Sequence, residues 1–135
     1  MIYKYIILFL IIHTVYASDA DEYVLLISMD GFRYDYLDKA NTPNFDKLVN
    51  TGVSAKALIP VFTSKTFPNH YSIATGMYAE NHGLIANTFF ANDLNKQYSI
   101  RDRNAVENGA FYGGEPIWVT AESQNVISAL SLIHI

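Results

Sequence analysis

The stretch Ser64-Lys65-Thr66-Phe67-Pro68-Asn69-His70-Tyr71 places a hydroxyl, a cation and an aromatic ring beside a proline. Proline suits the first turn of a helix, because the N–H that it lacks would have no partner there. The stretch and the apolar residues after it predict a helix that begins at Phe67 or Pro68 and ends at Gly76. Thr66 then lies at the helix N-terminus, where free N–H groups and the helix dipole favour anions. Thr66 is therefore either a helix cap, the commoner role, or a nucleophile for phosphoryl chemistry.

A second chemical group follows the apolar run Tyr23-Val24-Leu25-Leu26-Ile27-Ser28-Met29, which stops at Asp30-Gly31. Such a run is typical of a strand buried on both faces, as in a parallel sheet. Ligands gather at the carboxyl ends of these strands, so Asp30 is a candidate metal ligand. The alternative is an Asp-Gly turn with no further role. A threonine hydroxyl needs activation, and coordination to Zn²⁺ provides it without a dedicated base, so Asp30 and Thr66 make chemical sense as a pair.

The rest of the chain alternates helix and strand signals. Thr42 as N-cap, Pro43 after it and Gly52 at the end predict a helix over residues 42–49. Its apolar residues recur at i, i+3 and i+4 and predict one core-facing side; they are Phe45, Leu48 and Val49.

Further strands are predicted at residues 53–59 and 84–90, and residues 97–100 are predicted to pair back as a hairpin. Residues 101–114 resemble a surface loop, and Pro116 is expected to open another helix. The pattern predicts an α/β domain with a largely parallel sheet flanked by helices. The sheet is expected to be incomplete, because about three strands are found where five or six are usual.

Composition narrows the possible functions. The chain has 135 residues, half of them apolar, which suits a single globular domain. A formal charge of −4 without basic runs argues against binding a nucleic-acid polymer through its phosphates. The absence of cysteine excludes thiol catalysis and thiolate metal sites, so any metal must be held by oxygen and imidazole.

Residues 1–17 have the layout of a secretory signal peptide: Lys4, an apolar run to Val15, then Val15-Tyr16-Ala17 before the expected cleavage site. The mature protein, residues 18–135, is therefore expected to be secreted. The alternative is an uncleaved signal anchor, although the run is short for a membrane span of roughly 20 residues.

Several spaced motifs resemble one family. They are Ile27-Ser28-Met29-Asp30-Gly31-Phe32-Arg33, Lys65-Thr66-Phe67-Pro68-Asn69-His70-Tyr71, Thr75-Gly76-Met77-Tyr78-Ala79-Glu80-Asn81-His82-Gly83-Leu84-Ile85-Ala86-Asn87 and Pro116-Ile117-Trp118-Val119-Thr120. In this order they are similar to the ectonucleotide pyrophosphatase/phosphodiesterases of the alkaline phosphatase superfamily. The resemblance covers roughly residues 22–124 and implies an alkaline-phosphatase-like fold in which this chain is the N-terminal part of the catalytic domain.

The resemblance also implies a function: hydrolysis of phosphodiester or pyrophosphate bonds in a nucleotide or other small phosphodiester, with two Zn²⁺ ions. By that match Thr66 is the nucleophile and bridges to zinc, and Asp30 binds one zinc ion. Asn87 matches the asparagine that hydrogen-bonds a phosphate oxygen, and Phe67 the aromatic residue that lines the substrate pocket. Without the match, Phe67 is equally a core residue and Asn87 a turn residue.

Three further polar side chains could have a functional role or only a structural one. Lys65 either steers phosphate or is merely exposed. His70 matches no metal position of the family, and His82 lies in the loop of a family motif; both are expected to be structural.

The chain departs from the family in two ways. The remaining zinc ligands of the family have no counterpart here, and the tail from Asn125 to Ile135 does not resemble the expected continuation. This chain alone is therefore expected to be inactive, and any membrane attachment would need the signal anchor or a missing C-terminal anchor. Two alternatives stay open: a phosphatase or sulfatase of the same superfamily, and a non-catalytic secreted binding protein with a truncated phosphodiesterase fold.

Overall fold

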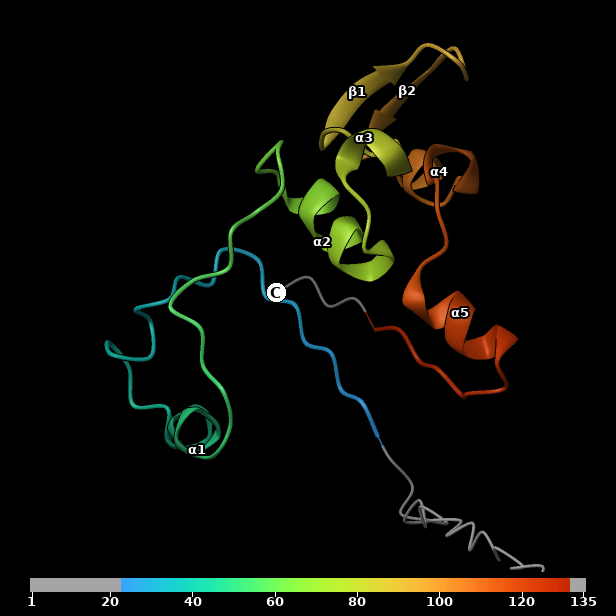
Figure 1. Cartoon of the computed structure of the whole chain (residues 1–135). Helices are drawn as coiled ribbons and strands as arrows, with labels where there is room; N and C mark the ends of the chain where they lie inside the picture. The colour runs from blue at the N-terminus through green and yellow to red at the C-terminus, as the bar shows by residue number, and fades with distance from the viewer. Residues whose placement is uncertain (1–22, 132–135) are drawn as a thin grey trace, which may run out of the picture.

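The structure is a computed structural model that describes residues 23–131, so the predicted signal peptide at residues 1–17 lies outside the described residues. Its elements, in chain order, are α1 (Pro43–Thr51), α2 (Thr66–Thr75), α3 (Ala79–His82), β1 (Thr88–Ala91), β2 (Lys96–Ser99), α4 (Arg103–Val106), the 3₁₀ turn η1 (Gly109–Phe111) and α5 (Ile117–Ser123). Figure 1 shows α2 to α5 and the hairpin gathered together, with α1 apart from them. None of the helices within residues 23–131 is long and apolar enough to cross a membrane.

The core belongs to the second half of the described chain. Tyr98 of β2 and Leu84 are fully buried, and Ala91, Ala105 and Phe111 complete the buried cluster. The ring of Tyr98 lies 5.2 Å from that of Phe111 in an edge-on arrangement, which aromatic pairs favour. Burying the phenol raises the pKa of Tyr98, so its hydroxyl stays protonated and bonds the Tyr112 hydroxyl at 2.9 Å.

The sheet differs from the prediction. β1 and β2 form a two-stranded antiparallel hairpin in which Phe89 pairs with Tyr98, so the predicted hairpin is confirmed. Within residues 23–131 no parallel strands are present, and the predicted strands at residues 23–29 and 53–59 are irregular. Their side chains are exposed, with Val24 at 92% and Ile59 at 88%. A doubly buried strand needs partners on both edges and cover on both faces, and the described residues supply neither.

Helix α1 forms as predicted, with Pro43 in its first turn and Gly52 after its end. Its predicted core face is wrong, because α1 has no buried residue and Leu48 is 64% exposed. Phe45 is also exposed, and its ring lies 6.1 Å from that of Phe32, in the segment before the helix. Helix-forming signals are local, whereas burial depends on what packs against the helix.

Residues 101–114 are more ordered than the predicted surface loop. They contain α4, which Asp102 caps by accepting the Asn104 N–H at 3.0 Å, and η1, which contributes the buried Phe111. The Asp102 cap is a local signal that the loop prediction passed over. The predicted helix at Pro116 is confirmed as α5, with Pro116 as its N-cap residue.

His82 is buried at the end of α3 and has the structural role predicted for it. The Leu84 N–H donates to its Nδ1 at 3.1 Å, so the neutral ring carries its proton on Nε2, which lies 2.9 Å from the Ser72 hydroxyl. Burial lowers the pKa of His82, because the charged ring would lose its hydration.

Replacing a buried leucine should lower the free energy of unfolding much more than replacing an exposed one. We expect Leu84→Ala to lower the free energy of unfolding by about 2–5 kcal/mol, because it leaves a cavity in the core. Leu48→Ala on the exposed face of α1 should change it by no more than about 0.5 kcal/mol. Urea unfolding followed by circular dichroism measures both, and equal losses would contradict the assigned core.

Acid should destabilise the fold through His82. The pKa of His82 is lowered in the folded state. Below about pH 6.5, His82 therefore binds a proton in the unfolded chain but not in the folded chain. Stability should therefore be complete above that pH and fall as the pH drops towards the lowered pKa, by at most about 1.4 kcal/mol per pH unit. Urea unfolding between about pH 7.5 and 5 checks this. A His82→Gln variant should have a flatter profile, and an unchanged slope would refute the assignment.

Candidate active site

Thr66 is the first residue of α2, and the structure does not use its side chain as the helix cap. The N-cap residue is Lys65, whose side chain makes no capping hydrogen bond. The Thr66 hydroxyl donates instead to Oδ2 of Asp30, at an O–O distance of 3.3 Å. The structure thus brings together two side chains that lie 36 residues apart in the sequence.

Asp30 lies in a turn after the extended residues 23–29, and Gly31 in that turn has a φ of +64°, which glycine adopts without strain. The predicted Asp-Gly turn is therefore present, and the carboxylate of the same turn faces Thr66. The turn and the contact with Thr66 do not exclude each other, since the turn sets the direction in which the carboxylate points.

A second contact holds the Asp30 segment against α2. The Ser28 hydroxyl and Nδ1 of His70 lie 2.7 Å apart. Thr66 and His70 are four residues apart and share a helix face, and their partners Asp30 and Ser28 lie two residues apart in the segment that packs against it. Two contacts therefore join one face of α2 to the segment around Asp30, which gives His70 the structural role predicted for it.

Asn87 reaches the same helix end from the other side. Its Oδ1 accepts the Phe67 N–H at 3.1 Å, and its backbone oxygen accepts the Ile100 N–H at 3.0 Å beside the hairpin. Because a backbone N–H requires an acceptor, the amide oxygen must face the helix. The Nδ2 donor remains for another acceptor, which is the chemistry that the family resemblance requires of Asn87.

Two other predicted site residues are placed differently. Phe67 is half-buried and packs against the core cluster, which matches the structural role weighed for it. Lys65 is exposed, and no ion pair involves it among the described residues. The substrate roles of both remain predictions.

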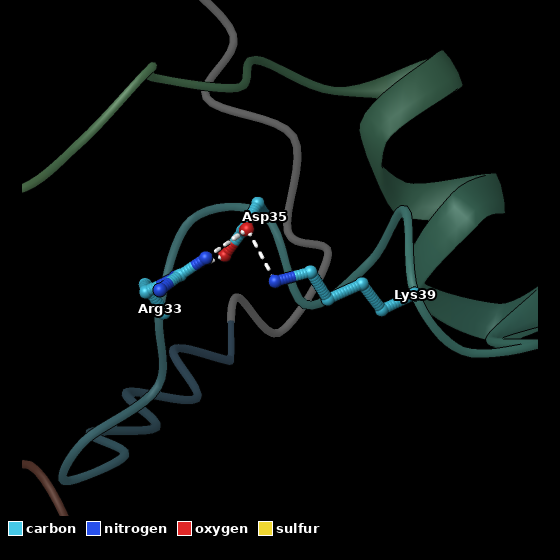
Figure 2. A network of polar contacts seen from close by, with 3 residues as sticks. All are labelled: Arg33, Asp35 and Lys39. Carbon is cyan, nitrogen blue, oxygen red and sulfur yellow. Dashed lines mark hydrogen bonds and ion pairs between the residues drawn. The ribbon is translucent and has the colours of Figure 1, made fainter.

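The charged side chains that follow Asp30 in the sequence form ion pairs with one another. Figure 2 shows Arg33 and Lys39 converging on Asp35, with the Lys39 ammonium 2.7 Å from its Oδ2. Arg33, with Lys39 adding to its effect, lowers the pKa of Asp35 to about 2. Arg33 lies close to Asp30 in the sequence but pairs with Asp35, whereas the Asp30 carboxylate accepts the Thr66 hydroxyl.

The metal-binding capacity of the described residues is limited. Within residues 23–131 no group of three or more histidines, aspartates or glutamates is placed to hold a metal ion. Asp30 and Thr66 offer two converging oxygen atoms, which suit a divalent cation but fill only half of the usual four positions around zinc. The pair therefore fits part of one zinc site and is too small for two.

Asn69 is a residue of this site that sequence reasoning missed. Its side-chain amide bonds the backbone of residues 61–65, which lead into Thr66. The only signal in the sequence is an amide side chain one turn inside a helix that begins after an irregular segment.

Known proteins resemble this chain over most of its length. The model of the family described as type I phosphodiesterase / nucleotide pyrophosphatase matches residues 24–133, which extends past the resemblance noted above. The chain is 40% identical over 121 residues to human ectonucleotide pyrophosphatase/phosphodiesterase family member 5, covering 89% of this chain and 25% of that protein. It is 46% identical over 105 residues to bovine family member 3, covering 76% and 12%, and 45% identical over 108 residues to the venom phosphodiesterase of Naja atra, covering 78% and 13%.

The chain thus spans at most about a quarter of these relatives. Their names all describe hydrolases of phosphodiester or pyrophosphate bonds, and none describes a non-catalytic binding protein.

Proposed function

Because the chain belongs to the type I phosphodiesterase / nucleotide pyrophosphatase family, we propose that it carries the nucleophile of a zinc-dependent hydrolase. The reaction is cleavage of a phosphodiester or pyrophosphate bond in a nucleotide or similar small substrate. One observation carries the proposal: the Thr66 hydroxyl at the N-terminus of α2 meets the Asp30 carboxylate at 3.3 Å. Thr66 does not use its hydroxyl to cap its helix, so the hydroxyl is free to make this contact.

The proposed reaction has two steps. The Thr66 oxygen gives its proton to solvent and attacks phosphorus, so that a bond to Thr66 forms as the bond to the leaving oxygen breaks. The leaving oxygen departs as an anion or takes up a proton from solvent. A water molecule then attacks the same phosphorus, and the bond between phosphorus and the Thr66 oxygen breaks. The phosphate monoester is released, and the Thr66 oxygen takes back a proton that the attacking water gives up. The positive end of the α2 dipole attracts the phosphate, and the Asn87 amide donates to one of its oxygens.

We assign Asp30 and Thr66 as ligands of one zinc ion, with two ions expected in the complete domain. Bound zinc lowers the pKa of a coordinated hydroxyl and stabilises negative charge on phosphate oxygens. Asp30 holds its place through the turn at Gly31 and the neighbouring Ser28–His70 contact. Lys65 adds positive charge at the entrance, and Phe67 offers an aromatic surface to the leaving group.

The same proposal covers the fold and the location of the complete protein. The apolar residues 23–29 would be a strand of a parallel, alkaline-phosphatase-like sheet once the rest of the domain covers them, which explains why such side chains lie exposed here. Residues 1–17 would direct the protein into the secretory pathway, so the substrate would be extracellular.

Replacing the nucleophile tests the assignment in the complete, zinc-loaded domain. We expect Thr66→Ala to abolish hydrolysis of a nitrophenyl phosphodiester while the circular dichroism spectrum stays unchanged, because the variant lacks only the attacking oxygen. Thr66→Ser should retain measurable turnover. Thr75→Ala, at the other end of α2, serves as a matched control and should retain at least about half of the activity. Normal turnover by Thr66→Ala would refute the role of Thr66.

The 135-residue chain alone should bind Zn²⁺ weakly and show no significant turnover, because two oxygen ligands cannot complete a zinc site. Isothermal titration with Zn²⁺ measures the affinity, and we expect Asp30→Asn to weaken it further. Tight binding of two ions, or robust hydrolysis by the purified chain, would show that the ligand set has been underestimated.

A further inference from the structure

We propose that Asn69 is a positioning residue that fixes the backbone of Thr66 and thereby aims its hydroxyl. Asn69 lies in the first turn of α2, and its side chain points back to residues 61–65, the irregular segment that leads into the helix. The inference rests on the proposed function, because aiming matters only if Thr66 attacks a substrate.

The hydrogen bonds of Asn69 use its whole side-chain amide. Its Oδ1 accepts the Val61 N–H at 2.8 Å. Its Nδ2 donates to the carbonyl oxygen of Lys65 at 2.8 Å and to that of Thr63 at 3.2 Å, with the Val61 oxygen at 3.5 Å as a weaker third contact. An amide has one acceptor oxygen and two donor hydrogens, so this arrangement leaves neither group idle.

The position of these bonds shows what they control. The Lys65 carbonyl belongs to the peptide plane that precedes the Thr66 Cα, and Asn69 holds this carbonyl. The Phe67 N–H belongs to the peptide plane that follows the same Cα, and Asn87 holds this N–H. Two asparagine side chains therefore restrain the two planes whose rotations are the φ and ψ of Thr66.

This restraint is directed at the nucleophile and goes beyond what the helix needs. A helix start tolerates water or a simple cap on its free groups, whereas this one is tied to a segment that begins eight residues earlier. The direction of the Cα–Cβ bond follows from φ and ψ, so the place of the Thr66 oxygen depends on both peptide planes. A misplacement of about 1 Å at a reacting group costs on the order of 100-fold in rate.

Substitutions can separate the role of the Asn69 acceptor oxygen from the role of its two N–H donors. Asn69→Asp has nearly the same shape and can still accept the Val61 N–H, but it turns an oxygen towards the carbonyls of Lys65 and Thr63. Asn69→Ala removes both functions. Asn104 is an exposed residue of α4 whose side chain makes no hydrogen bond within the described residues, so Asn104→Asp is the matched control.

The decisive measurement is the single-turnover rate constant of the complete, zinc-loaded domain, with enzyme in excess and saturating over a nitrophenyl phosphodiester. A partly unfolded sample changes the enzyme concentration needed for saturation and leaves this rate constant as it was. A merely structural role therefore does not move it, and a positioning role does. We expect a fall on the order of 100-fold for Asn69→Asp and Asn69→Ala, and the wild-type value for Asn104→Asp.

A wild-type rate constant in both Asn69 variants would overturn the inference, as would an equal loss in Asn104→Asp. Thr66→Ala is run alongside: if it turns over normally, the proposed function fails, whereas if it is inactive and the Asn69 variants are normal, only the positioning role fails. Amide hydrogen exchange in the 135-residue chain adds a readout without catalysis. The Val61 N–H should exchange faster in Asn69→Ala than in the wild type, and equal rates would show that the bond is absent in solution.

Discussion

The contact between the Thr66 hydroxyl and the Asp30 carboxylate joins two parts of the described chain: the mostly exposed residues before α2, and the packed residues from α2 onwards. Asp30 follows a segment that packs poorly, whereas Thr66 begins a helix that packs against the core. The Ser28–His70 contact runs beside it, and Asn87 fixes the helix end from the side of the hairpin. The candidate site therefore depends on a few polar bonds around the N-terminus of α2, each of which is worth only about 0.5–1.5 kcal/mol.

Stability and chemistry are distributed unevenly along the chain. The second half has a core built around Tyr98 and Leu84, which gives the hairpin, α2 and the short helices a rigid base. The first half exposes apolar side chains at residues 23–29 and 53–59. One site residue, Asp30, belongs to the loosely packed half, and Thr66 and Asn87 to the firmly packed half. Burial of these exposed apolar residues would consequently fix the position of Asp30 as well as stabilise the fold.

Local signals in the sequence predicted what local forces decide. Helices α1, α2 and α5 and the hairpin follow from proline and glycine positions and from apolar spacing, and all four are present. The exposure of Leu48 and the irregular course of residues 23–29 were not predictable, because both depend on what packs against these residues. The Asp30–Thr66 contact was anticipated through chemistry and resemblance. The hydrogen bonds of Asn69 to residues 61–65 were not anticipated, since their partners are backbone atoms that carry no sequence signal.

The account depends most on Thr66 as the atom that bonds phosphorus, and a trapped intermediate tests this directly. Trypsin cleaves after Lys65 and next after Lys96, so Thr66 becomes the first residue of its own peptide. Mass spectrometry of the complete, zinc-loaded domain, quenched with acid during turnover of a nucleotide substrate, should find this peptide heavier by one nucleotidyl group, with the added mass on Thr66. An added mass on another residue, or turnover with no modified peptide under conditions that trap such intermediates, would contradict the account.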